Sequence, residues 1–155
     1  MKRASLAAIV AVLAVAPCGA AAATPDDPCA TVATSDAAKA LGTAVVSRKA
    51  GAAGPSRSCA FHGGGPLQSI VVTTFRYTTP ADAHAAFTSM IAQTAAMGSP
   101  ALPAPGIGDE AKAIFSTIYA RKGTALYVFN IFGHRGPELT ARAAGLAKTT
   151  LAHVH

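Results

Sequence analysis

Alternating apolar and polar positions predict two long β-strands, over residues 67–77 and 125–132. In the first strand, the alternation divides the side chains into two sets, which are Ile70, Val72 and Thr74 on one side and Val71, Thr73, Phe75 and Tyr77 on the other. Because the second set holds the aromatic side chains, we expect it to face the core. In the second strand, Leu126 and Val128 lie opposite Tyr127, Phe129 and Ile131.

A helical period predicts a long helix that begins after Thr79, with threonine as its N-cap and Pro80 at its first position. Its apolar stripe comprises Ala83, Phe87, Met90, Ile91, Thr94 and Met97, and Gly98 ends it. A shorter helix is expected over 36–41, capped by Ser35 and stopped by Gly42.

The last helix is expected to open at 136–138 and to run to about residue 153, with an inner stripe of Leu139, Ala143, Leu146, Ala147 and Thr150. Shorter strands are predicted over 43–47, 58–62 and 114–121, with a possible edge strand at 109–113. A turn at 122–123 predicts an antiparallel hairpin. The resulting order is helix, strands, helix, strands, helix, which indicates an α+β fold in which helices cover an antiparallel sheet.

The first 23 residues have the pattern of a secretory signal peptide. Lys2 and Arg3 precede an uncharged apolar run over 4–16, which is too short to span a bilayer. We expect cleavage near Ala21-x-Ala23, which leaves a single α+β domain over 24–155 and an exported, periplasmic, cell-envelope or extracellular protein. Cys18 follows Val15-Ala16-Pro17 as in a lipoprotein box, so lipidation at Cys18 is the alternative to its removal with the signal, and membrane attachment is expected only in that case.

Charge excludes one class of partner. The chain carries 13 Lys and Arg against 7 Asp and Glu, and loss of residues 1–23 leaves 11 against 7, a net charge of +4. The basic residues are scattered and form no run that could follow a phosphate backbone, so we expect no nucleic-acid partner.

Two cysteines, Cys29 and Cys59, remain after the signal, and an even count in an exported chain indicates a disulfide. Two buried thiols are the alternative. The spacing does not fit a zinc site, and we expect neither a metal nor a cofactor.

Several short motifs resemble a family of small exported actinobacterial proteins and lipoproteins of the DUF3558 type, and the extracellular sensor domain of the mycobacterial kinase PknH. The matching segments are Pro28-Cys29, Ala37-Ala38-x-x-Leu41-Gly42, Cys59-x-Phe61 and 106–111. The resemblance covers about residues 28–153 and implies a Mog1- or PsbP-like α/β sandwich and a bond between Cys29 and Cys59. It implies no established chemistry, and this chain has no kinase domain.

Candidate catalytic residues are few. Segment 106–111 fits G-x-G-x-x-A, but a proline-rich loop precedes it, which favours a turn over a nucleotide site. Asp109 and Glu110 are expected to point to opposite faces of an extended segment, or to fix this turn by hydrogen bonds. His153 and His155 are expected to be solvated. No nucleophile motif is present.

These observations favour a non-catalytic, sensor-like module that binds a small apolar ligand or an envelope protein. Its recognition elements would be a sheet face and two loops, 50–57 and 98–108. The alternatives are a cell-envelope hydrolase, which would need His62, Asp109 and His134 to converge, and a purely structural envelope protein. An apolar pocket of a few hundred Å³ would favour the binding module.

Overall fold

The computed structural model describes residues 27–133 and 138–154, so the expected signal peptide and Cys18 lie outside the described residues. In chain order the elements are α1 (Pro28–Thr31), α2 (Thr34–Leu41), β1 (Val45–Ala53), β2 (Ser56–Gly63), β3 (Ser69–Arg76), α3 (Pro80–Ala95), β4 (Leu102–Pro103), β5 (Glu110–Ile114), β6 (Thr117–Lys122), β7 (Ala125–Phe132) and α4 (Glu138–Ala152). The predicted α+β class is confirmed. The specific sandwich remains a prediction, and the second group of strands has four members where the sequence indicated two or three.

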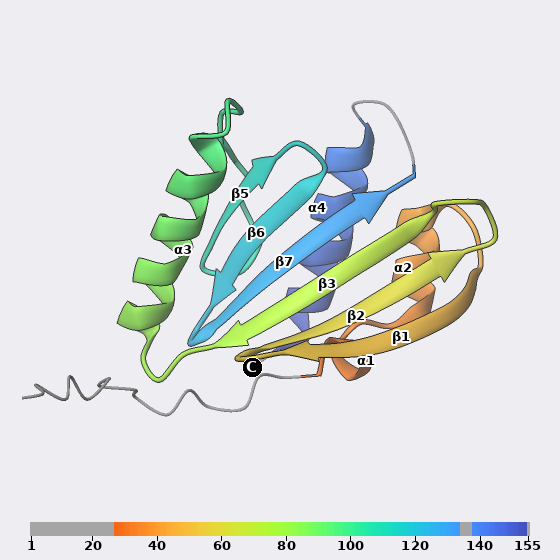
Figure 1. Cartoon of the computed structure of the whole chain (residues 1–155), viewed down its shortest axis with the longest axis horizontal. Helices are drawn as coiled ribbons and strands as arrows, with labels where there is room; N and C mark the ends of the chain where they lie inside the picture. The colour runs from red at the N-terminus through yellow and green to blue at the C-terminus, as the bar shows by residue number, and fades with distance from the viewer. Residues whose placement is uncertain (1–26, 134–137, 155) are drawn as a thin grey trace, which may run out of the picture.

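The strands form one antiparallel sheet in the order β1-β2-β3-β7-β6-β5-β4 (Figure 1). We call one end of this sheet the Phe132 end, where β1, β3 and β6 begin and β2, β5 and β7 stop. The opposite end is the Ala125 end, where Arg76 and Lys122 pair with Ala125. The predicted hairpin at residues 122–123 is confirmed and joins β6 to β7 at the Ala125 end.

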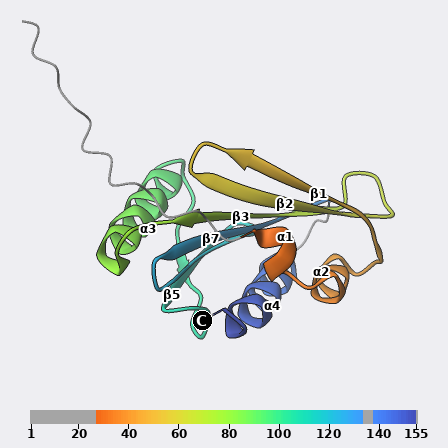
Figure 2. The ribbon, with the colours of Figure 1, turned by 90° about the horizontal axis from the view of Figure 1, so that it is seen from below.

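Helices cover the two faces of the sheet unequally. Helices α1, α2 and α4 lie on one face, whereas α3 lies on the other (Figure 2). The main core is on the first face, where the largest fully buried side chains include Phe61, Tyr127 and Phe129. Helix α3 buries Ala83 and Phe87 on the second face, close to β5, β6 and β7.

Local sequence explains where the helices begin and end. Helix α3 begins as predicted, because the Thr79 side chain accepts a hydrogen bond of 3.1 Å from the Asp82 backbone N–H, and Pro80 is the first helical residue. Helix α2 ends at Gly42, which has a φ of 70°. The predicted cap Ser35 is wrong, since α2 begins at Thr34 and Ala33 is its N-cap.

The structure joins Cys29 to Cys59 by a disulfide, with their Cα atoms 5.1 Å apart. The bond attaches the four-residue α1 to the middle of β2, and the Arg48 guanidinium donates a hydrogen bond of 3.2 Å to the Cys29 carbonyl. This short helix is therefore held by tertiary contacts, as a helix of its length must be.

Two predicted segments have a different structure. The expected loop 50–57 is the tip of a hairpin, because β1 extends to Ala53 and β2 begins at Ser56. The expected strand 114–121 is two strands, divided by a turn at Phe115 and Ser116. The possible edge strand at 109–113 corresponds to β5, and β4 lies within the expected loop 98–108.

The expected orientation of β3 is wrong. Ile70, Val72 and Thr74 are buried in the main core, whereas Val71, Thr73 and Phe75 are half-buried on the opposite face. Cross-strand partners explain the outcome, since Val72 pairs with Cys59 on one side and Phe129 on the other. Together these residues form a continuous apolar layer under α1, α2 and α4.

Candidate functional site

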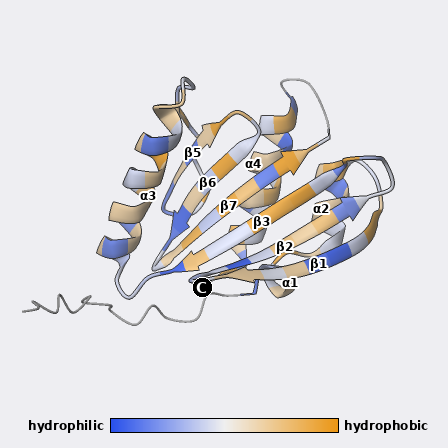
Figure 3. Ribbon diagram, viewed as in Figure 1, coloured by the Kyte–Doolittle hydropathy of each residue, from blue (hydrophilic) through white to orange (hydrophobic). Residues whose placement is uncertain are grey.

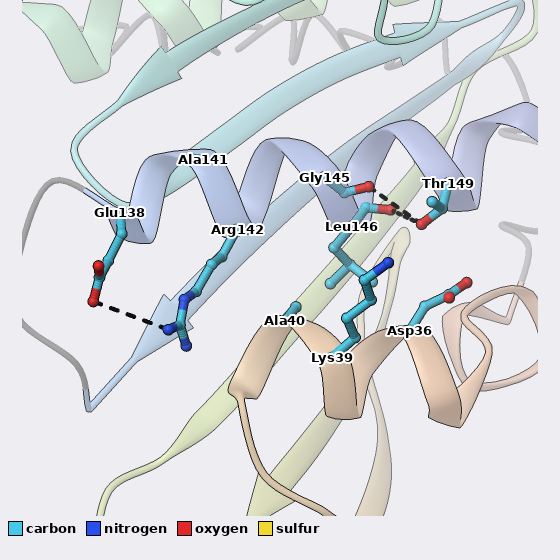
Figure 4. A pocket seen from close by; sticks show the side chains of 9 residues that line it. All are labelled: Asp36, Lys39, Ala40, Glu138, Ala141, Arg142, Gly145, Leu146 and Thr149. Atoms are coloured by element: carbon cyan, nitrogen blue, oxygen red, sulfur yellow. Dashed lines mark hydrogen bonds and ion pairs between the residues drawn. The ribbon is translucent and has the colours of Figure 1, made fainter.

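An apolar groove lies between α2 and α4 (Figure 4). Its volume is about 380 Å³, which is within the usual range for small-molecule sites. The residues that line it are Asp36, Lys39 and Ala40 on α2 and Glu138, Ala141, Arg142, Gly145, Leu146 and Thr149 on α4. Its surface combines an apolar floor with charged groups at the rim.

The groove follows from the distribution of side chains around α4. The large inner residues of this helix, Leu146 and Leu151, are buried against the sheet. Ala141, Gly145 and Thr149 recur every four residues and therefore form a second stripe, beside the inner one. Because these side chains are small or absent, α2 and α4 leave a space between them where larger residues would interdigitate.

Gly145 is the least expected residue in this stripe. It occupies the interior of α4, where glycine costs about 1 kcal/mol relative to alanine. Its backbone has an ordinary helical conformation, and a Cβ atom added there would meet no other atom within 4 Å. Neither backbone geometry nor packing therefore requires glycine, and its visible consequence is an open groove floor.

The charged residues at the rim are only weakly paired. The Arg142 guanidinium lies 4.0 Å from the Glu138 carboxylate, at the limit for an ion pair, and it also lies against Gly42. Neither Asp36 nor Lys39 forms an ion pair with another described residue. The Lys39 ammonium can therefore accept an anionic partner without losing an existing one.

A second polar cluster surrounds Arg121 at the Ala125 end. The guanidinium contacts Glu110 and donates a hydrogen bond of 3.0 Å to the Asp109 carboxylate. The same carboxylate accepts a hydrogen bond of 2.7 Å from the Gly123 backbone N–H. His84 lies 2.7 Å from Glu110. The expectation that Asp109 and Glu110 diverge is thus wrong, whereas the expectation that they fix the turn by hydrogen bonds is confirmed.

The electrostatics of Glu110 match a structural role. Burial alone would raise the pKa of Glu110, but hydrogen bonds from His84 and Arg121 and the charge of Arg121 outweigh it, so the pKa lies below its ordinary value of 4.5. A general acid at neutral pH needs the opposite shift. This cluster therefore holds β5, β6 and the 106–109 turn together.

The residues proposed for a hydrolase do not converge. His62 lies with Phe132 at one end of the sheet, and Asp109 binds Gly123 at the other end. The eight residues of β7 separate these ends by about 24 Å. His134 and His155 lie outside the described residues. Within 27–133 and 138–154, no cluster of three His, Cys, Asp or Glu side chains could hold a metal ion.

The glycines of segment 106–111 belong to a turn, as expected. Gly106 and Gly108 have φ values of 75° and 58°. The Asp109 backbone N–H donates a hydrogen bond of 2.8 Å to the Arg121 carbonyl. A Cβ atom on Gly108 would collide with that carbonyl. Strand β5 follows directly, so the segment lacks the helix that a phosphate site requires.

Sequence reasoning missed the groove, because it depends on how two helices distant in the chain are placed. Glycine in the interior of the last helix was the available signal. No helix in the described part of the chain is long and apolar enough to cross a membrane. The chain matches no family model, no curated protein and no solved structure.

Proposed function

We propose that this protein is an exported, non-catalytic binding module whose α2–α4 groove takes the apolar part of a small amphiphile. The observation that carries the proposal is the floor at Gly145, where the helix has no side chain and the groove stays open. A residue that breaks a local preference without a compensating contact is often placed for function. The expected sandwich architecture and extracytoplasmic location belong to this proposal.

The preferred ligand class follows from the rim. A ligand with a short alkyl chain can cover Ala40, Ala141 and Leu146, all of which border the groove. Its polar end would then lie at the rim, where the Lys39 ammonium, which forms no ion pair with another described residue, favours a carboxylate. An alkyl carboxylate therefore matches both parts of the groove.

The test is the thermal stability of the protein with increasing octanoate, since a ligand that binds the folded state raises the unfolding temperature. Gly145→Leu fills the groove and is expected to abolish the rise. Ala152→Leu, on an exposed position of α4 outside the groove, is expected to retain it. An equal response of the two variants, or no response of the parent protein, contradicts the proposal.

Substitution of Lys39 distinguishes binding of the ligand's carboxylate from binding of its alkyl chain. Lys39→Ala is expected to weaken binding of octanoate several-fold while binding of octanol changes little. Equal losses for both ligands would show that the ammonium does not contact the polar group.

A further inference from the structure

The two edges of the sheet are built differently. Strand β4, at one edge, has two residues, and one of them is Pro103, which has no backbone N–H to donate. Strand β1, at the other edge, has nine residues and no proline (Figure 1). Short strands and prolines are among the devices that protect a sheet edge from pairing with another chain. The β4 edge is therefore protected, whereas the β1 edge is left long.

The backbone of β1 directs polar groups away from the sheet. Its burial pattern is exposed at every position after the first, and β2 is its strand partner among the described residues. Ala53 pairs with Ser56 across a two-residue turn, so these two residues exchange hydrogen bonds, and every second residue before Ala53 also bonds to β2. The N–H and C=O groups of Arg48, Ala50 and Ala52 therefore point to the open edge. Helix α1 packs across β1, β2 and β3 on the covered face of the sheet and does not lie alongside β1 (Figure 2).

Most of β1 keeps the regular geometry that pairing with a further strand requires. A β-bulge interrupts the register with β2 between Val45 and Ser47, and from Ser47 to Ala53 the register is unbroken. The segment 50–53 consists of alanine and glycine, which are depleted in strands, and burial does not compensate for them here. Their small side chains leave space for the side chains of an incoming strand.

The half of the sheet that contains β1 carries positive charge and no acid. Residues 37–81, which include β1, β2 and β3, contain no Asp or Glu, and their basic residues are Lys39, Arg48, Lys49, Arg57 and Arg76. Lys49 and Arg57 are exposed on the β1–β2 hairpin, and neither forms an ion pair with another described residue. Arg48 and Lys49 give β1 a hydrophilic stretch (Figure 3).

The acidic residues of the adjoining helices have other contacts. At the start of α1, the Asp27 carboxylate accepts a hydrogen bond of 2.9 Å from the Cys29 backbone N–H. Asp36 on α2 borders the groove between α2 and α4. The positive charge of the β1 edge is therefore not neutralised by ion pairs within the described part of the chain.

Charge decides between the occupants that an open edge can take. Pairing of two copies through β1, centred on its middle residue Lys49, would place two ammonium groups opposite each other, which destabilises a strand pair. A strand with Asp or Glu at alternate positions would instead place carboxylates beside Lys49. The same charge thus disfavours a second copy and favours an acidic partner.

We propose that the open edge of β1 binds an extended acidic segment of a partner protein, which adds a strand to the sheet beside β1. Main-chain hydrogen bonds to Arg48, Ala50 and Ala52 supply affinity, and Lys49 selects acidic side chains. The proposal goes beyond the α2–α4 groove and does not depend on it, because no residue of β1 lines the groove.

The test measures fluorescence anisotropy of a labelled peptide of alternating Val and Glu, mixed with the full chain. The same peptide with Lys in place of Glu is the probe control. Lys49→Glu reverses the charge at the edge, and Lys148→Glu makes the same change on an exposed position of α4 outside the groove. Ala50→Pro removes an outward N–H that β2 does not use, so the β1–β2 pairing is retained. Ala52→Pro takes its place if Ala50→Pro does not fold, as judged by circular dichroism.

We expect the Glu peptide to bind the parent protein and the Lys peptide not to bind. Lys49→Glu should weaken binding about tenfold, Lys148→Glu should change it little, and the proline variant should abolish it. The proposal is overturned if the Glu peptide does not bind, if both peptides bind equally, if Lys148→Glu weakens binding as much as Lys49→Glu, or if the proline variant binds like the parent. A dimer seen by analytical ultracentrifugation without peptide, and lost in the proline variant, would assign the edge to a second copy instead.

Discussion

Removal of the Cys29–Cys59 disulfide should destabilise the protein strongly. The bonded residues are 30 apart, and the chain-entropy relation gives about 3.7 kcal/mol for a closed loop of that length. Cys59 is fully buried in the main core, so truncation there adds a packing loss of roughly 1 kcal/mol. The total, about 4–5 kcal/mol, is a large part of the stability of an ordinary domain.

The experiment compares the parent protein with Cys29→Ser/Cys59→Ala in urea, followed by circular dichroism and linear extrapolation. Cys18→Ser is present in both proteins, so that no third thiol can exchange with the pair. We also expect the α1 amides to lose hydrogen-exchange protection first, because the bond joins this helix to β2. A loss below about 1 kcal/mol, with α1 still protected, would refute the claim that the bond holds the start of the fold.

Three further changes test local interactions. Gly145→Ala should raise the free energy of unfolding by about 1 kcal/mol, measured by urea denaturation, and a decrease would mean that the helix needs glycine there. Thr150→Val should also raise it by about 1 kcal/mol, since the buried Thr150 hydroxyl has no hydrogen-bond partner among the described residues; a clear loss would reveal one. Because the pKa of Glu110 is lower in the folded protein, its carboxylate stabilises the fold above pH 4.5, and this contribution disappears as pH falls through the folded pKa. Glu110→Gln should therefore make the urea midpoint fall less steeply below pH 4.5, and an unchanged profile would count against the Arg121 and His84 contacts.

Local signals in the sequence were sufficient for some elements. Thr79, Pro80 and Asp82 supply the N-cap, the first helical residue and an acidic residue of the first turn within four positions, and α3 begins there. The turn at residues 122–123 joins two strands of regular alternation, and the observed hairpin follows. In both cases the determining contacts are close in the chain.

Other elements depend on position in the sheet. Strand β1 lies at an edge and is almost wholly exposed, so it carries no apolar alternation, and Gly51, Gly54 and Pro55 near its end favour a loop. The β5–β6 turn contains Phe115 and Ser116 in place of glycine or proline, because neighbouring structure imposes the positive φ. The aromatic residues of β3 do not mark its inward face, because the cross-strand partners on β2 and β7 determine which face is buried.

The candidate site was the least predictable feature. Residues that looked reactive, such as Asp109 and Glu110, form a structural cluster with Arg121. The apolar part of the groove is formed by alanine, glycine and leucine, which have no distinctive chemistry until α2 and α4 lie side by side. Only a structure can reveal a site of this kind.

A map of backbone amide chemical shifts during titration with octanoate tests the proposed groove most directly. We expect saturable changes concentrated at Ala40, Ala141 and Gly145, which border the groove from both helices. Changes centred on the open face of β2 and β3, or the absence of any saturable change, would contradict binding between α2 and α4.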